Sequence, residues 1–220
     1  MRGRRATLGL GLGLAMVGVA CDGGAGAGEG PLARSPETTA TGPAAEARAP
    51  IEVRYRIERR VGDAATAGFG EVVRATLDDP RGWTGADFRL VEDAGAPYLV
   101  VLAEGDEVDR LCAPYRTAGR FSCQNGPTVA INADRWRTAT DKWTGDVATY
   151  RQMLVNHEVG HLLGRHHPPG PQCPAAGRPA PVMAQQSTEL DGCLPNPWPL
   201  PGELEAAARH DEPLAPPYEP

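Results

Sequence analysis

The chain has 220 residues, of which 27 are glycine, 22 are proline and 5% are aromatic. This length allows one folded domain with tails, and the composition predicts many turns and a modest core. The formal net charge is −6 at pH 7, and no stripe of basic residues is visible, so we expect no nucleic-acid partner.

The first 20 residues have the pattern of an export signal. Arg2, Arg4 and Arg5 form a basic segment, and residues 6–20 are uncharged and mostly apolar. This apolar stretch has the length of a signal-peptide core and is short for a membrane-spanning helix. We therefore expect residues 1–20 to be a signal peptide that directs the protein out of the cytoplasm.

The signal runs into Gly18-Val19-Ala20-Cys21, and small residues just before a cysteine resemble a bacterial lipobox. A lipid on Cys21 would hold the protein on the outer face of the cytoplasmic membrane. The alternatives are ordinary cleavage with secretion and an uncleaved anchor. Three of the 22 basic residues and none of the 28 acidic residues precede Cys21, which leaves a formal charge of −9 on the remainder.

Residues 21–49 consist mainly of Gly, Ala, Pro, Glu, Ser and Thr, and we predict a disordered tether there. The folded domain is expected over residues 50–210, with a flexible tail over 211–220. Apolar patterns predict strands over residues 51–57, 88–91, 98–102 and 128–132. Together with the helices below, they predict an α+β (mixed α/β) domain with a mixed sheet.

Helical spacing of apolar residues predicts a helix over residues 69–77, which ends at Asp78-Asp79-Pro80. A longer helix is expected from a cap at Thr144 or Asp146 to about Leu163, with Gly164 as its stop. A proline-rich loop follows over residues 168–181, and a short helix is expected near 203–209. The segment between residues 111 and 126 is expected to be a loop stapled by its two cysteines.

Four cysteines follow Cys21, namely Cys112, Cys123, Cys173 and Cys193. An even number in a chain expected to be exported predicts two disulfides. Three pairings are possible, and we favour the sequential one, Cys112–Cys123 and Cys173–Cys193, over free buried thiols. Loops of this size would each stabilise the fold by roughly 3 kcal/mol. No Cys-x-x-Cys occurs, which argues against a cysteine-based zinc site.

Four of the five histidines fall within one segment, His157-Glu158-Val159-Gly160-His161-Leu162-Leu163-Gly164-Arg165-His166-His167. On a helix, His157 and His161 leave one face and can reach one ion. Gly164 permits a left-handed turn that returns His167 to the same ion, with adjacent His166 as the alternative. Three imidazoles leave one position for water, as in catalytic zinc sites. Glu158 is then placed to act as a general base.

The string His-Glu-x-x-His-x-x-Gly-x-x-His resembles the signature of the metzincin clan of zinc peptidases. That clan has a methionine in a tight turn beneath the metal. Ala180-Pro181-Val182-Met183 matches in position and type, so the resemblance implies that Met183 forms this Met-turn, which a Cys173–Cys193 disulfide would bracket. Some metzincins carry a metal-binding tyrosine two residues later. Gln185 stands there, so no tyrosine ligand is implied.

Seven segments also resemble a family of exported proteins of unknown function from high-GC Gram-positive bacteria. They are Asp78-Asp79-Pro80-Arg81-Gly82-Trp83, Leu111-Cys112, Ser122-Cys123, Tyr150-Arg151, Val155-Asn156-His157-Glu158-Val159-Gly160-His161, Ala180-Pro181-Val182-Met183 and Asn196-Pro197-Trp198-Pro199. The resemblance covers about residues 50–210. It implies a metzincin-like domain with the zinc motif and no particular substrate.

Together these features predict a monomeric, exported zinc peptidase that acts on a peptide or protein substrate. Zinc would lower the pKa of a water and polarise the scissile carbonyl, and Glu158 would pass the proton of that water to the leaving amine. One alternative is an inactive, zinc-stabilised binding or scaffold lipoprotein. The other is a zinc amidase acting on cell-wall peptide.

Overall fold

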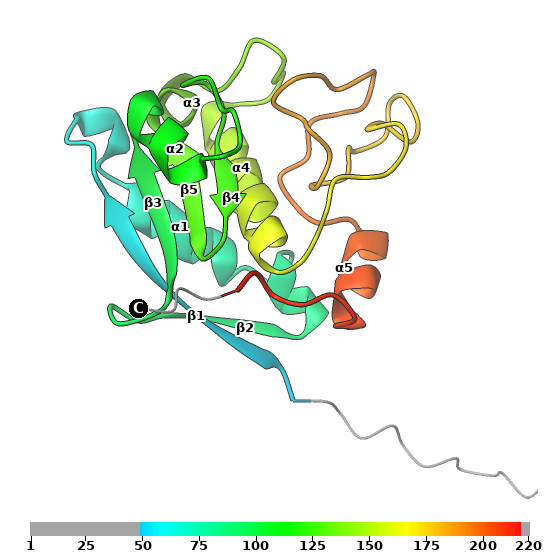
Figure 1. The fold of residues 1–220 in the computed structure, drawn as a ribbon. Coiled ribbons are helices and arrows are strands. Elements are labelled where there is room, and N and C mark those ends of the chain that lie inside the picture. Colours follow the sequence, from blue (N-terminus) through cyan, green and yellow to red (C-terminus); the bar gives the residue numbers. More distant parts are fainter. Residues whose placement is uncertain (1–48, 217–220) are drawn as a thin grey trace, which may run out of the picture. The chain divides into compact units, whose positions relative to one another are not determined.

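The computed structural model describes residues 49–216 (Figure 1). The predicted signal peptide over residues 1–20, the possible lipid anchor Cys21 and nearly all of the predicted tether lie outside the described residues, as do residues 217–220. Among the helices of residues 49–216, none combines the length and the apolar character needed to cross a membrane.

A five-stranded mixed sheet forms the centre of the domain, with strand order β2-β1-β3-β5-β4. Its strands are β1 (Ile51–Arg59), β2 (Phe88–Glu92), β3 (Tyr98–Ala103), β4 (Cys123–Asn125) and β5 (Thr128–Asn132). The first four in this order are parallel, and β4 runs antiparallel to β5 at the edge. The predicted mixed α/β fold is confirmed.

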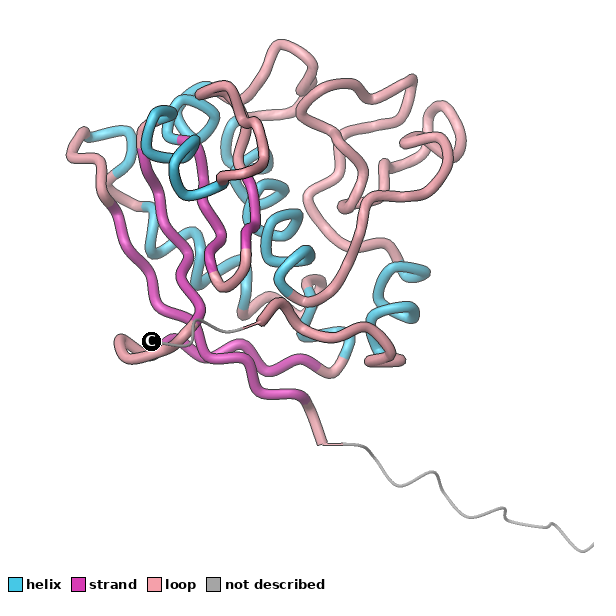
Figure 2. Tube along the Cα trace, in the orientation of Figure 1, coloured by secondary structure: helices cyan, strands magenta, loops and turns pink. Residues whose placement is uncertain are grey.

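Helices cover both faces of this sheet (Figure 2). They are α1 (Phe69–Leu77), α2 (Gly105–Cys112), α3 (Ala133–Thr138), α4 (Val147–Leu162) and α5 (Pro201–Ala208), with short 3₁₀ turns η1 (Ala64–Thr66) and η2 (Trp83–Ala86). Side chains alternate between the two faces of β3. Val100 and Leu102 join the large core with α1 and α4, whereas Leu99 and Val101 join a smaller cluster with α2. Every residue of β3 is therefore buried.

The segment between residues 111 and 126 differs from the predicted stapled loop. It contains the end of α2, a loop and the short strand β4. Cys123 pairs with Ala130 and Asn125 with Thr128 across a tight turn at Gly126, whose φ is +53°. The three-residue strand is too short to show an alternating pattern in the sequence, and its pairing with β5 defines it.

Helix α4 is largely buried, with 10 of its 16 residues in the buried class. Asp146 caps it by accepting a hydrogen bond of 2.7 Å from Thr149 N. Gly164, at φ +79°, ends it in a left-handed conformation. Both ends agree with the prediction, and the helix brings its polar residues His157 and Glu158 into the interior.

Residues 211–216, assigned to a tail from the sequence, contact the domain. Ala215 N donates a 2.9 Å hydrogen bond to Leu162 O at the end of α4, and the Tyr98 hydroxyl donates a 2.8 Å bond to Ala215 O. Leu214 and Ala215 also pack against the large core. This segment therefore lies against the last turn of α4.

Candidate metal centre

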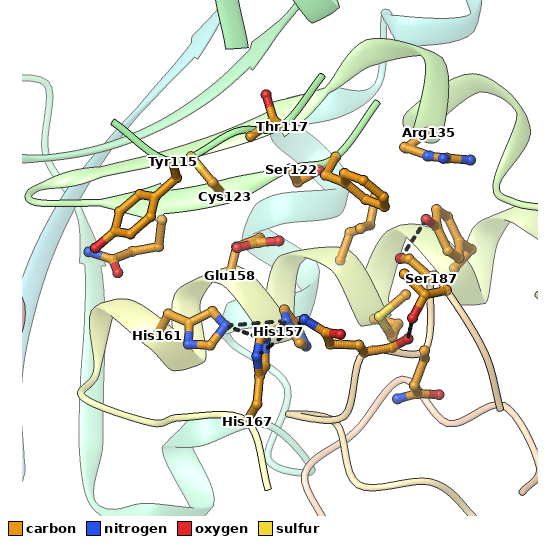
Figure 3. A pocket seen from close by; sticks show the side chains of 18 of the residues that line it. Tyr115, Thr117, Ser122, Cys123, Arg135, His157, Glu158, His161, His167 and Ser187 are labelled. Atoms are coloured by element: carbon orange, nitrogen blue, oxygen red, sulfur yellow. Dashed lines mark hydrogen bonds between the residues drawn. The ribbon is translucent and has the colours of Figure 1, made fainter. Parts of the chain in front are cut away.

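Three histidines meet at the C-terminal end of α4 (Figure 3). His157 and His161 leave the same face of the helix, and His167 returns from the loop after Gly164. The Nε2–Nε2 distance is 3.3 Å for His157 and His161, 3.1 Å for His161 and His167, and 3.2 Å for His157 and His167. The donor atoms of a tetrahedral zinc site with bonds of about 2.0–2.1 Å stand roughly 3.3–3.4 Å apart. The spacing therefore suits a metal ion bound by all three nitrogens.

The hydrogen bonds of the Nδ1 atoms, on the side of each ring away from the cluster, show why a cation fits here. Nδ1 of His157 lies 2.8 Å from Val182 O, and Nδ1 of His161 lies 2.7 Å from Arg165 O. A carbonyl oxygen only accepts, so both Nδ1 atoms carry the proton and both Nε2 atoms are bare. Two lone pairs then face each other at 3.3 Å, and a shared cation relieves their repulsion.

Protonation of these rings is unfavourable. Burial lowers the pKa of His157 to about 3 and that of His161 to about 4. Burial also lowers the pKa of His167. Neutral imidazoles are the form that binds a metal, so the chain presents these rings in their ligand state. His166, the alternative ligand, lines the adjacent pocket but lies outside the three-nitrogen cluster.

The Glu158 side chain lies beside the histidines and faces the same pocket (Figure 3). Only 6% of the residue is exposed. Burial raises the pKa of Glu158 to about 8. A divalent cation at the histidines would draw this pKa down again, which gives a carboxylate able to exchange a proton near neutral pH.

Met183 lies beneath the helix, in a turn over residues 181–184 that is closed by a hydrogen bond from Ala184 N to Pro181 O. It is buried, and its side chain packs against Gly160. A Cβ atom at Gly160 would meet the Met183 sulfur and would lie 2.8 Å from Trp83 Cζ2. Gly160 therefore permits the close approach of α4 to this turn.

Glu203, at the start of α5, fixes the turn and was not identified from the sequence. Its carboxylate accepts hydrogen bonds from Val182 N at 3.0 Å, Met183 N at 2.9 Å and Leu200 N at 2.8 Å. Burial raises the pKa of Glu203, and these donors oppose that rise. The sequence signal is a glutamate three residues into a helix, which resembles half of a capping box.

A pocket of about 680 Å³ opens beside the histidines. Its lining residues come from α4 between Tyr150 and His161, from the loop after α4, from β4 and the loop before it, from α3 and from residues 185–188. Because β4 is the last strand of the sheet, this pocket lies along a sheet edge. It is large enough for a short stretch of peptide.

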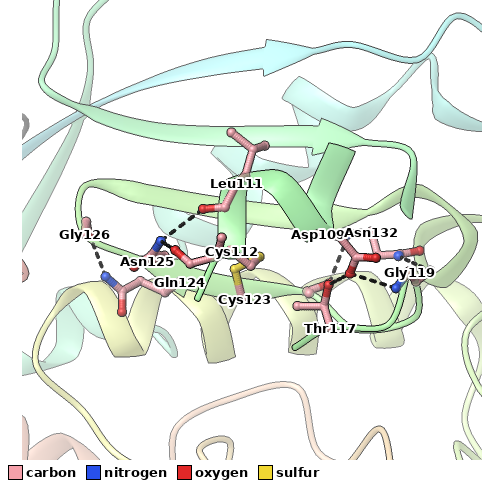
Figure 4. Close-up of a disulfide and its surroundings, with 12 residues drawn as sticks. Asp109, Leu111, Cys112, Thr117, Gly119, Cys123, Gln124, Asn125, Gly126 and Asn132 are labelled. Atoms are coloured by element: carbon pink, nitrogen blue, oxygen red, sulfur yellow. Dashed lines mark hydrogen bonds between the residues drawn. A yellow bond between two sulfur atoms is a disulfide. The ribbon is translucent and has the colours of Figure 1, made fainter. Parts of the chain in front are cut away.

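Two disulfides hold the segments around the pocket, in the sequential pairing favoured above. Cys112–Cys123 joins α2 to β4, with Cα atoms 6.1 Å apart (Figure 4). Asn125 supports this junction by donating to Leu111 O at 3.1 Å and to Ala113 O at 2.9 Å. Cys173–Cys193, with Cα atoms 5.6 Å apart, encloses the segment that contains Met183.

The fold and the site thus define a mixed α/β domain with a three-histidine candidate metal centre. The chain belongs to the protein family of unknown function DUF3152, which it matches over residues 29–201. No curated protein matches it. Among solved structures it is similar to archaemetzincin from Methanopyrus kandleri, at 13% identity and a TM-score of 0.44, over 72% of this chain and 95% of that chain. A likeness this distant carries no conclusion about activity.

Proposed function

We propose that this protein is a zinc-dependent peptidase. The observation that supports it most directly is the pair of bare Nε2 atoms of His157 and His161, held 3.3 Å apart next to His167. A buried carboxylate, Glu158, lies beside them at an open pocket. A purely structural zinc site would more often fill all four positions with protein ligands.

In this proposal His157, His161 and His167 hold the metal, which when bound polarises a carbonyl group and lowers the pKa of water. Glu158 accepts a proton from the attacking water and delivers it to the departing amine. The carbonyls of Val182 and Arg165 fix the tautomer and orientation of the first two imidazoles.

An extended peptide would lie along β4, whose residues Cys123 and Gln124 line the pocket. A strand added to a sheet edge gains main-chain hydrogen bonds that do not depend on its sequence. This arrangement supports a peptide or protein as substrate, and it would present the bond to be cut to Glu158.

We further propose that the protein acts outside the cytoplasm, as a monomer. The basic and apolar pattern of residues 1–20 supports export, and Cys21 supports a lipid anchor in the membrane. The two disulfides fit an oxidising compartment. Without the lipid, the same signal would lead to secretion.

The test compares the wild-type protein with Glu158→Gln on a peptide library, with and without a chelator, and measures metal in the same samples. We expect about one zinc per chain in both proteins, and cleavage by the wild type that the chelator abolishes. Glu158→Gln should lower the rate by roughly 10²–10⁴-fold. Undiminished cleavage by zinc-loaded Glu158→Gln would contradict the role of Glu158. Cell-wall peptides in the library separate an amidase from a general peptidase.

A further inference from the structure

The pocket extends well beyond the histidines, to a polar end where Figure 3 shows Arg135 and Ser187. Tyr150 lines the same end, since its hydroxyl oxygen is 2.8 Å from Ser187 Oγ. Helix α4 forms its floor, from Tyr150 through Met153 and Leu154 to His157. Tyr150 precedes His157 by seven residues, which corresponds to about 10 Å along the helix axis. The polar end is therefore separate from the candidate metal centre but belongs to the same pocket.

Arg135 reaches this end from α3 with most of its donors free. Its Nε donates a 2.7 Å hydrogen bond to Arg120 O, and its guanidinium carbon lies 5.9 Å from the centre of the Phe121 ring. A guanidinium carries five N–H donors. Within residues 49–216 Arg135 makes no other side-chain hydrogen bond and no ion pair, so four donors remain.

A second arginine on the same helix shows the contrast. Arg137 forms ion pairs with Asp63, Glu104 and Asp134, at 2.8, 2.6 and 2.9 Å. The fold therefore provides carboxylates for Arg137 and none for Arg135, which lines the pocket. A partly buried arginine without a carboxylate partner is suited to binding one from outside.

The groups beside Arg135 fit the same ligand. The Tyr150 hydroxyl and Ser187 Oγ are 2.8 Å apart, so one donates to the other and the second proton can point into the pocket. Glu158 is the only carboxylate among the pocket-lining residues, against the two arginines Arg116 and Arg135. This charge distribution favours an acidic group and disfavours a basic one.

We propose that Arg135, with Tyr150 and Ser187, binds a carboxylate of the substrate and so selects acidic peptides. About 10 Å is spanned by roughly three residues of extended chain, so the carboxylate belongs to a residue within about three positions of the bond to be cut. It is supplied by an Asp or Glu side chain or by the C-terminus of the peptide. That the bound peptide is a substrate rests on the proposed peptidase function. The binding of a carboxylate at Arg135 does not depend on that function.

The test measures binding apart from turnover, with the zinc-loaded Glu158→Gln protein as the parent. The probes are fluorescently labelled, end-capped alanine peptides that carry a single Glu, Gln or Lys, and an uncapped alanine peptide. We expect the Glu peptide to bind roughly 10–100-fold more tightly than the Gln peptide, as a charge-assisted, bidentate contact would give. The Lys peptide should bind more weakly than either. Preference for the uncapped peptide over its capped form would identify the C-terminal carboxylate as the source.

Variants at two neighbouring arginines distinguish a specific contact from general charge. Arg135→Gln should abolish the preference for Glu, and Arg135→Lys should retain part of it. Arg120→Gln removes an equal charge at the same 5.9 Å from the centre of the Phe121 ring and leaves the main-chain acceptor of Arg135 in place. It should keep the preference. Thermal unfolding of each variant verifies that the domain is folded.

Equal binding of the Glu and Gln peptides, together with equal binding of the capped and uncapped alanine peptides, overturns the proposal, as does a carboxylate preference that survives in folded Arg135→Gln. The same measurements test the proposed peptidase function separately from the carboxylate site. If the wild type cleaves no peptide while Glu binding depends on Arg135, the carboxylate site stands without the peptidase. If it cleaves peptides with no Arg135-dependent acidic preference, the peptidase stands without the carboxylate site.

Discussion

His157 donates a hydrogen bond from Nδ1 to the carbonyl oxygen of Val182, and the two atoms are 2.8 Å apart. Val182 directly precedes Met183, and the main-chain nitrogens of both residues donate to Glu203. The orientation of His157 thus depends on this turn, and the carboxylate of Glu203 on α5 holds the turn in place. Helix α5 therefore supports the candidate metal centre through this turn.

Replacing Glu203 by glutamine should weaken both the fold and the metal centre. One amide oxygen cannot accept all three main-chain donors, so we expect a loss of about 1–3 kcal/mol in the free energy of unfolding. Because the turn orients His157, the affinity for zinc should fall by roughly 10–100-fold. Urea unfolding and competition with a chelating dye measure the two effects. Glu205→Gln, an exposed position on the same helix, is the control and should change neither.

Two adjacent histidines provide a matched test of the metal ligands. His166 and His167 are both exposed and lie on the same loop, but only His167 belongs to the three-nitrogen cluster. His167→Ala should lower zinc affinity by more than about 100-fold, since changes outside the ligand set already cost 10–100-fold. His166→Ala should leave it unchanged. The reverse result, measured by the same dye competition, would assign the third ligand to His166.

Gly160→Ala should be strongly destabilising. The added methyl group meets the Met183 sulfur and lies 2.8 Å from Cζ2 of the buried, rigid Trp83 ring. We expect a loss of about 1–3 kcal/mol from overpacking. Gly202→Ala, where no atom lies within 4 Å of the new Cβ, should be neutral or stabilising by about 0.5–1 kcal/mol. Equal urea midpoints for the two variants would contradict this packing.

The pH dependence of the metal-free protein should reveal the buried Glu158. Burial raises its pKa to about 8, so the folded state holds this proton more tightly than the unfolded chain does. The resulting stabilisation is complete below the unfolded pKa of about 4.3 and is lost as the pH rises through about 8. Glu158→Gln stays neutral throughout. With a chelator present, the wild type should therefore lose stability relative to Glu158→Gln between pH 5 and pH 8.

The expected loss is on the order of a few kcal/mol. Urea unfolding of both proteins at several pH values measures it, and the histidine contributions cancel because both proteins share them. Zinc should reduce the difference, since a nearby cation favours the carboxylate. Parallel pH profiles of the two metal-free proteins would show that Glu158 is not desolvated in the fold.

The sequence predicted the features that depend on local spacing. The interval of four between His157 and His161, a cap at Thr144 or Asp146 and the stop at Gly164 predict α4 without any knowledge of the rest of the fold, and the structure places the cap at Asp146. The position of Met183 required resemblance to a known clan, since a lone methionine carries no such signal. Strand β4 and the free guanidinium of Arg135 depend on residues brought together by tertiary packing, so no local pattern predicted them.

The contact between Ala215 and the last turn of α4 has a consequence for the order of biosynthesis. All three histidines and Glu158 are made by residue 167, yet the segment that covers the end of their helix is made almost fifty residues later. A nascent chain therefore carries all of these residues long before Met183, Glu203 and Ala215, which support the helix and the turn around them, have been made. A metal ion would be held in its final geometry only after residue 215 has been made, and a chain truncated before Met183 would carry the ligands without the contacts that orient them.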